Sequence, residues 1–148
     1  MSLQNLLRIG KLKVHEATAL ELKQLMVAAR RNLADAGVTE ISDETRFDAA
    51  YKAVMQCALA AMMAAGFRPS TSEPGHHLTL IQSLPLTLGI GNDTWIVLDA
   101  LRRKRNANDY TGDIVTGDMV DECAGQGRRL LTLLGANLEQ HRPDVSSG

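Results

Sequence analysis

Aromatic residues are scarce in this chain: one Trp, two Tyr and two Phe make up 3% of its 148 residues. Sheet-rich cores draw on aromatic and β-branched side chains, so this composition argues against a β-sandwich. The core must instead be built from Leu, Ala, Val and Met, which favour helices packed closely through small side chains. Hydrophobic residues make up 45% and charged residues 22%, as in ordinary soluble globular domains.

The chain also has few cysteines, no long apolar run and almost no net charge. Cys57 and Cys123 lie far apart in apolar periodic segments, without zinc-site spacing, so we expect two buried, reduced thiols. No apolar run approaches membrane-spanning length, and residues 1–16 lack a secretory signal, so we expect a cytoplasmic protein that binds no membrane. A net charge of −1 gives no whole-molecule attraction to nucleic acid, so such binding would require a local patch.

Apolar residues recur at three- and four-residue spacing in five segments, which predicts five main helices. The expected ranges are about 16–36, 42–65, 76–83, 92–106 and 116–140. A short lead-in helix, interrupted at Gly10, is expected before them. Ser42 is placed to cap the second helix. Pro85 either ends the third helix near Ser83 or kinks it.

The second helix is expected to be the centre of the fold. Its stretch "CALAAMMAAG", residues 57–66, is apolar almost all round, and its alanines allow neighbouring helices to approach closely. The inward face of the fourth helix is expected to consist of Ile96, Val97, Ala100 and Leu101. No segment alternates convincingly with β-branched enrichment. We therefore predict an all-α antiparallel bundle of four to five helices, without a sheet.

The bundle is expected to be a single domain over residues 1–148, because no repeat, low-complexity segment or linker divides it. Its core should span about residues 16–140, and residues 141–148 should form a flexible tail.

The stretch "LRRKRNANDY", Leu101–Tyr110, is the main functional motif. Cations are favourable at a helix C-terminus, so a solvated basic helix end would explain its composition without any function. The functional interpretation starts from the density of guanidinium groups, whose fork matches phosphate oxygens. The residues expected to line such a groove are Arg102, Arg103, Arg105, Asn106, Asn108, Asp109 and Tyr110.

The order of helices and this Arg-rich motif resemble the HEPN family, small helical bundles of toxin–antitoxin pairs and nucleotidyltransferase-associated systems. The resemblance covers about residues 16–140. Catalytic members carry Arg, four to six residues, then His, often followed one residue later by Tyr. Here Arg103 and Tyr110 fit that frame, and Asn108 occupies the histidine position. If Arg105 and Asn106 anchor the motif instead, Tyr110 takes that position.

The missing histidine bears directly on catalysis. Metal-independent RNA cleavage needs a group that exchanges a proton near neutral pH, and Asn108 cannot do so. The only histidine pair is His76 and His77. Adjacent histidines point to different sides of a helix and do not form a metal site alone, so one reading is an ordinary helix start. The other is that His76 or His77 approaches Arg103 and Tyr110 as a substitute acid/base.

Three classes of function remain open. The leading one, implied by the resemblance, is a homodimeric HEPN-like binding or regulatory module that faces RNA or a nucleotide, with an antitoxin or nucleotidyltransferase as protein partner. The second is a metal-independent endoribonuclease in which Arg103, Asn108 and Tyr110 are catalytic. The third is a helical protein-interaction module without a nucleic-acid role. No motif implies a cofactor or metal. The second and fifth helices carry more apolar residues than one buried stripe needs, and a dimer would cover them. These residues include Met62, Met63, Leu131 and Leu133.

Overall fold

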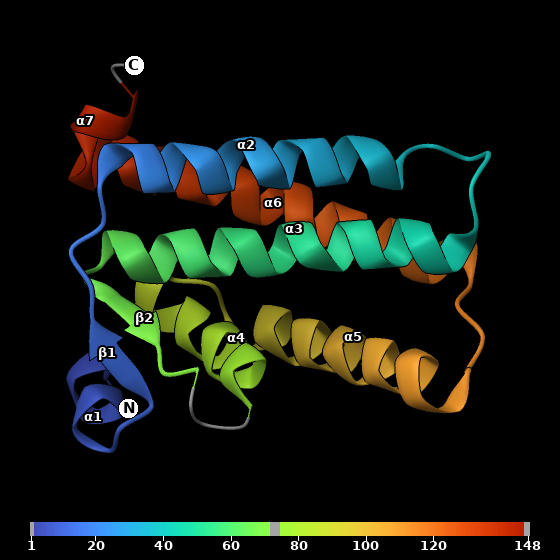
Figure 1. The fold of residues 1–148 in the computed structure, drawn as a ribbon, viewed down its shortest axis with the longest axis horizontal. Helices are drawn as coiled ribbons and strands as arrows, with labels where there is room; N and C mark the ends of the chain where they lie inside the picture. The colour runs from blue at the N-terminus through green and yellow to red at the C-terminus, as the bar shows by residue number, and fades with distance from the viewer. Residues whose placement is uncertain (1, 72–74, 147–148) are drawn as a thin grey trace.

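The chain is a packed helical bundle, 75% helix and 4% strand, which confirms the predicted fold class. The computed structural model describes residues 2–71 and 75–146. Figure 1 shows the order of the elements along the chain. They are α1 (Leu3–Arg8), β1 (Leu12–Val14), α2 (Ala19–Ala36), α3 (Asp43–Ala64), β2 (Phe67–Pro69), α4 (His76–Thr87), α5 (Asn92–Thr111), α6 (Gly117–His141) and α7 (Pro143–Ser146).

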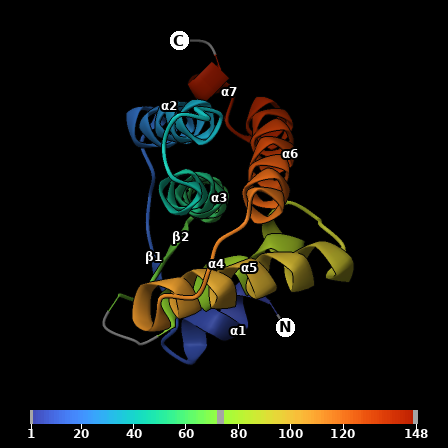
Figure 2. The same ribbon diagram turned by 90° about the vertical axis from the view of Figure 1, so that its right-hand side faces the viewer.

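Helix α3 is the centre of the bundle, as its composition predicts. Helices α2 and α6 pack on one side of α3, and α4 and α5 lie end to end along the other (Figures 1 and 2). The buried residues of α3 come from all round this helix, from Phe47 near its start to Met63 near its end. Cys57 in α3 and Cys123 in α6 are both buried and free, as expected. Burial raises the pKa of each thiol to about 12, so neither forms a thiolate readily.

Side-chain caps set the starts of three of the four long helices, α2, α3 and α6. Thr18 accepts a hydrogen bond from the amide of Glu21, whose carboxylate in turn accepts from the Thr18 amide, a reciprocal capping box. Ser42 caps α3 through the amide of Thr45, at the predicted position. Thr116 caps α6. The N-terminal boundary of α2 therefore lies at Thr18, two residues later than expected.

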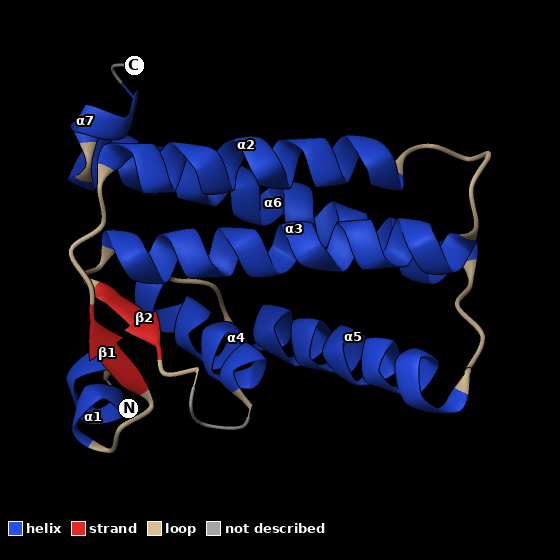
Figure 3. Cartoon of the chain, viewed as in Figure 1, coloured by secondary structure: helices blue, strands red, loops and turns tan. Residues whose placement is uncertain are grey.

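The absence of a sheet was wrongly predicted. Strands β1 and β2 pair antiparallel in the register Leu12↔Pro69, Lys13↔Arg68 and Val14↔Phe67 (Figure 3). Each strand has three residues, too few for alternation to be recognised in sequence. Gly66, at φ +99°, turns the chain out of α3 into β2, a conformation that residues with a side chain rarely adopt.

Helix α5 differs from expectation in length and in its inward face. It continues to Thr111, so "LRRKRNANDY" is helical throughout. Ile96 is 55% exposed and Ala100 is exposed, whereas Thr94, Leu98 and Asp99 are buried with Leu101. The buried face includes a threonine and an aspartate, and apolar spacing alone cannot reveal such a face.

Three further segments bear on the predictions. Helix α4 continues through Pro85 to Thr87, so the alternative in which it ends near Ser83 is wrong. Met62 and Met63 are buried within the bundle and leave no apolar surface for a second copy, whereas Leu131 and Leu133 are only partly buried against its core. Helix α7 occupies half of residues 141–148, and its Val145 is buried.

Candidate ligand-binding cleft

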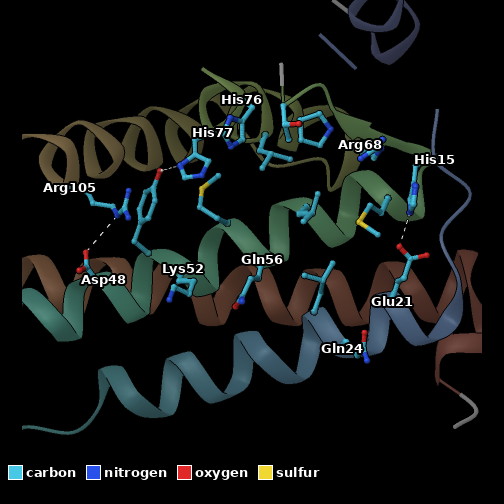
Figure 4. A pocket seen from close by; sticks show the side chains of 18 residues that line it. His15, Glu21, Gln24, Asp48, Lys52, Gln56, Arg68, His76, His77 and Arg105 are labelled. Atoms are coloured by element: carbon cyan, nitrogen blue, oxygen red, sulfur yellow. Dashed lines mark hydrogen bonds and ion pairs between the residues drawn. The ribbon is translucent and has the colours of Figure 1, made fainter. Parts of the chain in front are cut away.

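A cleft of about 800 Å³ runs along α3, between α2 on one side and β2, α4 and α5 on the other (Figure 4). This volume lies in the upper part of the range for small-molecule sites. Helix α3 supplies most of one wall, and its lining residues are Asp48, Tyr51, Lys52, Met55, Gln56, Leu59 and Met63. At the helical rise, Asp48 and Met63 lie roughly 22 Å apart along the axis, so the cleft is elongated.

One end of the cleft is organised around Tyr51. The guanidinium carbon of Arg105 lies 5.0 Å from the centre of the Tyr51 ring, within cation–π range. The Tyr51 hydroxyl and Nδ1 of His77 are hydrogen-bonded at 3.3 Å. His76 and His77 meet edge to face, with ring centres 4.7 Å apart. Helices α3, α4 and α5 thus bring a guanidinium, a phenol and two imidazoles together.

The guanidinium of Arg105 is held in place but poorly hydrogen-bonded. Its Nε lies 3.6 Å from Oδ1 of Asp48, and its Nη1 lies 3.7 Å from Oδ2 of Asp109. Both separations exceed hydrogen-bond length, and Nε is buried without a hydrogen-bond partner. Among the residues that the structure describes, no hydrogen bond reaches this guanidinium. Within this part of the chain its two Nη groups are neither hydrogen-bonded nor buried, so their donors are available to an anionic ligand that carries its own acceptors.

Protonation at this end follows from burial and from neighbouring cations. Burial raises the pKa of Tyr51 to about 12, against the opposing effect of Arg105 and Arg102, so the phenol stays neutral. Burial also lowers the pKa of His77, and the nearby charges of His76, Arg105 and Arg102 lower it further. His77 is therefore a neutral imidazole at pH 7. When its proton is on Nε2, Nδ1 accepts the hydrogen bond from Tyr51.

The other end of the cleft carries His15, Glu21 and Arg68 (Figure 4). Nε2 of His15 lies 2.8 Å from Oε2 of Glu21. The hydrogen bonds from the Thr18 amide and from His15 lower the pKa of Glu21, so its carboxylate is ionised and already occupied. Neither Lys52 nor Arg68 forms an ion pair within residues 2–71 and 75–146. The cleft therefore has cationic side chains without local partners at both ends.

Most of the motif predicted from sequence lies outside this cleft. Arg102 Nε and Arg103 Nη2 both donate to the buried carboxylate of Asp99, at 2.9 and 2.5 Å. Burial of Asp99 raises its pKa, but the hydrogen bonds from Arg102 and Arg103 outweigh this effect and lower it. Two of the four cations in the motif thus compensate one buried charge. Arg105 is the member of "LRRKRNANDY" that lines the cleft.

The other motif residues lie near the exposed end of α5. Nδ2 of Asn108 donates to the backbone oxygen of Asp113, which ties the end of the helix to the following turn. Asn106 is half-buried, and Tyr110 is 86% exposed. Arg103 and Tyr110 are seven residues apart in a continuous helix, so they lie on the same accessible side, offset by roughly 20°. His76 and His77 approach Arg105 and Tyr51, and the lining of the cleft includes neither Arg103 nor Tyr110.

No family model, curated protein or solved structure matches this chain.

Across the described residues, no cluster of three or more His, Cys, Asp or Glu side chains is placed to bind a metal ion. None of the helices in this part of the chain has the length and apolarity needed to cross a membrane.

Sequence reasoning missed the cleft residues Tyr51, Lys52, His15 and Arg68. One signal was present: Tyr51 and Lys52 fall in the central helix α3, near Asp48 and Gln56. Polar side chains at three- and four-residue spacing on a central helix indicate a second, less apolar face. His15 and Arg68 gave no signal, because a strand pairing between distant segments brings them together.

Proposed function

We propose that the chain is a binding module for a nucleotide or a short RNA, held in the cleft along α3. The observation that carries this proposal is the Arg105 guanidinium, fixed over Tyr51 with its hydrogen-bond donors unused. A phosphate supplies the hydrogen-bond acceptors that this guanidinium lacks, at distances shorter than those to Asp48 and Asp109. The imidazoles of His76 and His77, which are partly exposed, add flat faces on which a base can stack.

The test is a binding titration with fluorescein-labelled hexauridylate, followed by anisotropy at several salt concentrations. Binding through phosphate contacts requires the affinity to fall as the salt concentration rises. A plot of the logarithm of the binding constant against the logarithm of the salt concentration should have a slope of about −0.7 per phosphate contact on a single strand. Absence of binding at low salt would leave the third function, a protein-interaction module, as the better reading.

The HEPN-like character of the chain belongs to the same proposal. The helical architecture and the position of an Arg-rich motif on α5 support it. Under this proposal the partner is an antitoxin or nucleotidyltransferase protein, and ligand binding in the cleft is its regulatory signal. Co-purification of this chain with the product of an adjacent gene of either class is the corresponding test.

Endoribonuclease activity is a second candidate, favoured by one observation. His77 is neutral at pH 7 and hydrogen-bonded to Tyr51 beside an arginine. In the tautomer whose Nδ1–H donates to the Tyr51 oxygen, Nε2 is free to accept a proton from a ribose 2′-hydroxyl. In this candidate the proton acceptor is His77, which lines the cleft, and not Asn108. Incubation with hexauridylate in the presence of EDTA separates the two candidates, because cleavage requires a 2′,3′-cyclic phosphate product and simple binding leaves the RNA intact.

Ligand binding in the cleft should tighten as the pH falls from 8 to 5.5. In the free protein the pKa of His77 is lowered, so this imidazole is largely neutral at pH 7. A bound phosphate raises that pKa, so binding takes up a proton and becomes more favourable at lower pH. The gain should level off below the pKa of the free protein. Titrations across this range check the effect, and His77→Gln should reduce it.

His141 provides the matched control for the pH dependence. It lies at the end of α6 and is exposed, and it does not line the cleft. We expect His141→Gln to leave the pH profile of binding as in the wild type. An equal loss of pH dependence in both variants would show that the histidines act through the general charge of the protein.

A two-fold homodimer through α5 is also proposed. Ile96, Arg103 and Tyr110 follow one another at seven-residue spacing on the exposed side of this helix. Ile96 is 55% exposed and Tyr110 is 86% exposed, and pairing with a second copy would cover both. Light scattering at micromolar concentration should give twice the monomer mass of 16.1 kDa. Tyr110→Asp should shift the mass to the monomer, and a monomeric wild-type protein would exclude this interface.

A further inference from the structure

We infer that the β1–β2 sheet builds a second anion subsite, formed by Lys13, His15 and Arg68, at the end of the cleft opposite Arg105. The ligand would then be an elongated molecule with an anionic group at each end and a less polar body. A short single-stranded oligonucleotide is the form that suits the proposed function, on which this inference rests.

The register of the sheet places two cations directly opposite each other. Lys13 on β1 pairs with Arg68 on β2, and both residues are exposed. Directly opposed residues of an antiparallel pair project from the same face of the sheet, where like charges destabilise the pairing. His15, two residues after Lys13, projects from that face as well, and its amide donates to the carbonyl of Gly66 at 2.9 Å. A bound anion would relieve this repulsion.

Local carboxylates neutralise this group only in part. Glu21 is an acidic side chain that lines this end of the cleft, and its oxygens accept from His15 and from the Thr18 amide, so Glu21 is the partner of His15. In the described parts of the chain, neither Lys13 nor Arg68 takes part in an ion pair. Lys13 and Arg68 are therefore two opposed cations without a carboxylate partner among these residues, which favours an anion from solution.

The space between the two ends has a different character. Met55 and Leu59 lie between Asp48 and Met63 along α3, and the lining also includes Leu80 of α4 and Leu25 of α2. The ends are separated by roughly 22 Å along α3, so no single phosphate reaches both. A ligand that uses the whole cleft must present charge at its ends and bury a flatter, less polar part over these side chains.

The inference is tested by comparing a short and a long ligand. Wild-type protein, Arg68→Ala and Arg105→Ala are titrated with 5′-UMP and with hexauridylate. Hexauridylate spans both ends, so Arg68→Ala should weaken its binding roughly tenfold or more, the loss expected for a charge-assisted hydrogen bond. The same variant should leave 5′-UMP binding unchanged, since its one phosphate is held by Arg105. Arg105→Ala should weaken both ligands.

The salt dependence gives a second readout that a change in folding would not mimic. Arg68→Ala loses one phosphate contact, so the magnitude of the slope of the hexauridylate binding constant against salt concentration, both as logarithms, should fall by about 0.7. Arg68→Lys keeps the charge and should keep the slope. Arg128→Ala is the matched control, because Arg128 is an exposed arginine on α6 that does not line the cleft. It should change neither affinity nor slope.

Two results would overturn the second subsite. One is hexauridylate binding with the same affinity and slope in Arg68→Ala as in the wild type. The other is linear polyphosphate competing as strongly as hexauridylate, which would mean that the apolar middle contributes nothing. Failure of the proposed function looks different: neither 5′-UMP nor hexauridylate would bind the wild-type protein, or Arg105→Ala would have no effect on either.

Discussion

Replacing Arg105 by Ala should weaken binding of a nucleotide or RNA to this protein by roughly 10- to 150-fold. The substitution removes the guanidinium whose donors face the cleft without hydrogen bonds. Hydrogen bonds to charged groups contribute about 1.5–3 kcal/mol each, and that energy converts to the stated range of affinity. Arg105→Lys should have an intermediate affinity, because a lysine keeps the charge but loses the bidentate fork. Anisotropy titration with labelled hexauridylate measures all three proteins.

Arg103→Ala is the informative comparison. Arg103 belongs to the same motif, but its side chain is 72% exposed and its guanidinium is bound to Asp99, away from the cleft. Arg102 remains to compensate the buried carboxylate, so the variant should fold and bind as the wild type does. If Arg103→Ala loses more affinity than Arg105→Ala, the ligand binds on the outer side of α5 and not in the cleft. Circular dichroism of both variants confirms that the bundle is intact.

Replacing Gly127 by Leu should destabilise the fold by about 1–3 kcal/mol, the cost of overpacking a close-packed interior. Gly127 lies where α6 meets α2 and α3. A Cβ atom added there would lie 2.9 Å from Cδ2 of Leu33, 3.7 Å from Cγ2 of Val54 and 3.8 Å from the Ala50 carbonyl oxygen. Leu33 can shift to admit one methyl group, but the backbone of α3 leaves no room for a longer side chain.

Gly125 is the matched control on the same helix. An added Cβ at this position meets no atom within 4 Å. Leucine is a better helix former than glycine by up to about 0.8 kcal/mol, so Gly125→Leu should be neutral or mildly stabilising. Urea denaturation should therefore give Gly127→Leu a lower free energy of unfolding than the wild type, and Gly125→Leu an equal or slightly higher one. Equal stability of the two would show that α6 and α3 are less closely packed than the structure indicates.

The helices could be predicted because each carries its information locally. Thr18, Ser42 and Thr116 are side-chain caps, and the stripes between them repeat at helical spacing. The all-round burial of α3 also followed from its composition. The burial of Asp99 could not be predicted, since it depends on two arginines that are one turn further along the helix and look like solvated charges in sequence.

The cleft was beyond sequence reasoning for a related reason. The motif correctly drew attention to Arg105, but its partners lie on other helices: Tyr51 on α3 and His77 on α4. Nothing in the local pattern distinguishes Arg105 from Arg103, although one side chain faces the cleft and the other faces solvent. Residues two apart on a helix point in nearly opposite directions, so the rotation of α5 about its own axis decides which arginine faces the cleft.

The pairing of β1 with β2 also bears on the order in which the molecule folds. It joins segments separated by about 50 residues, so the entropy of closing that loop must be overcome before any strand contact is gained. Helices α2 and α3 fill the loop and are connected by a short turn, so their contacts are local and form early. Three-residue strands then add little cooperative stability of their own. The bundle can thus assemble first, and the His15–Arg68 end of the cleft is completed last, when the N-terminal segment docks on a nearly finished core.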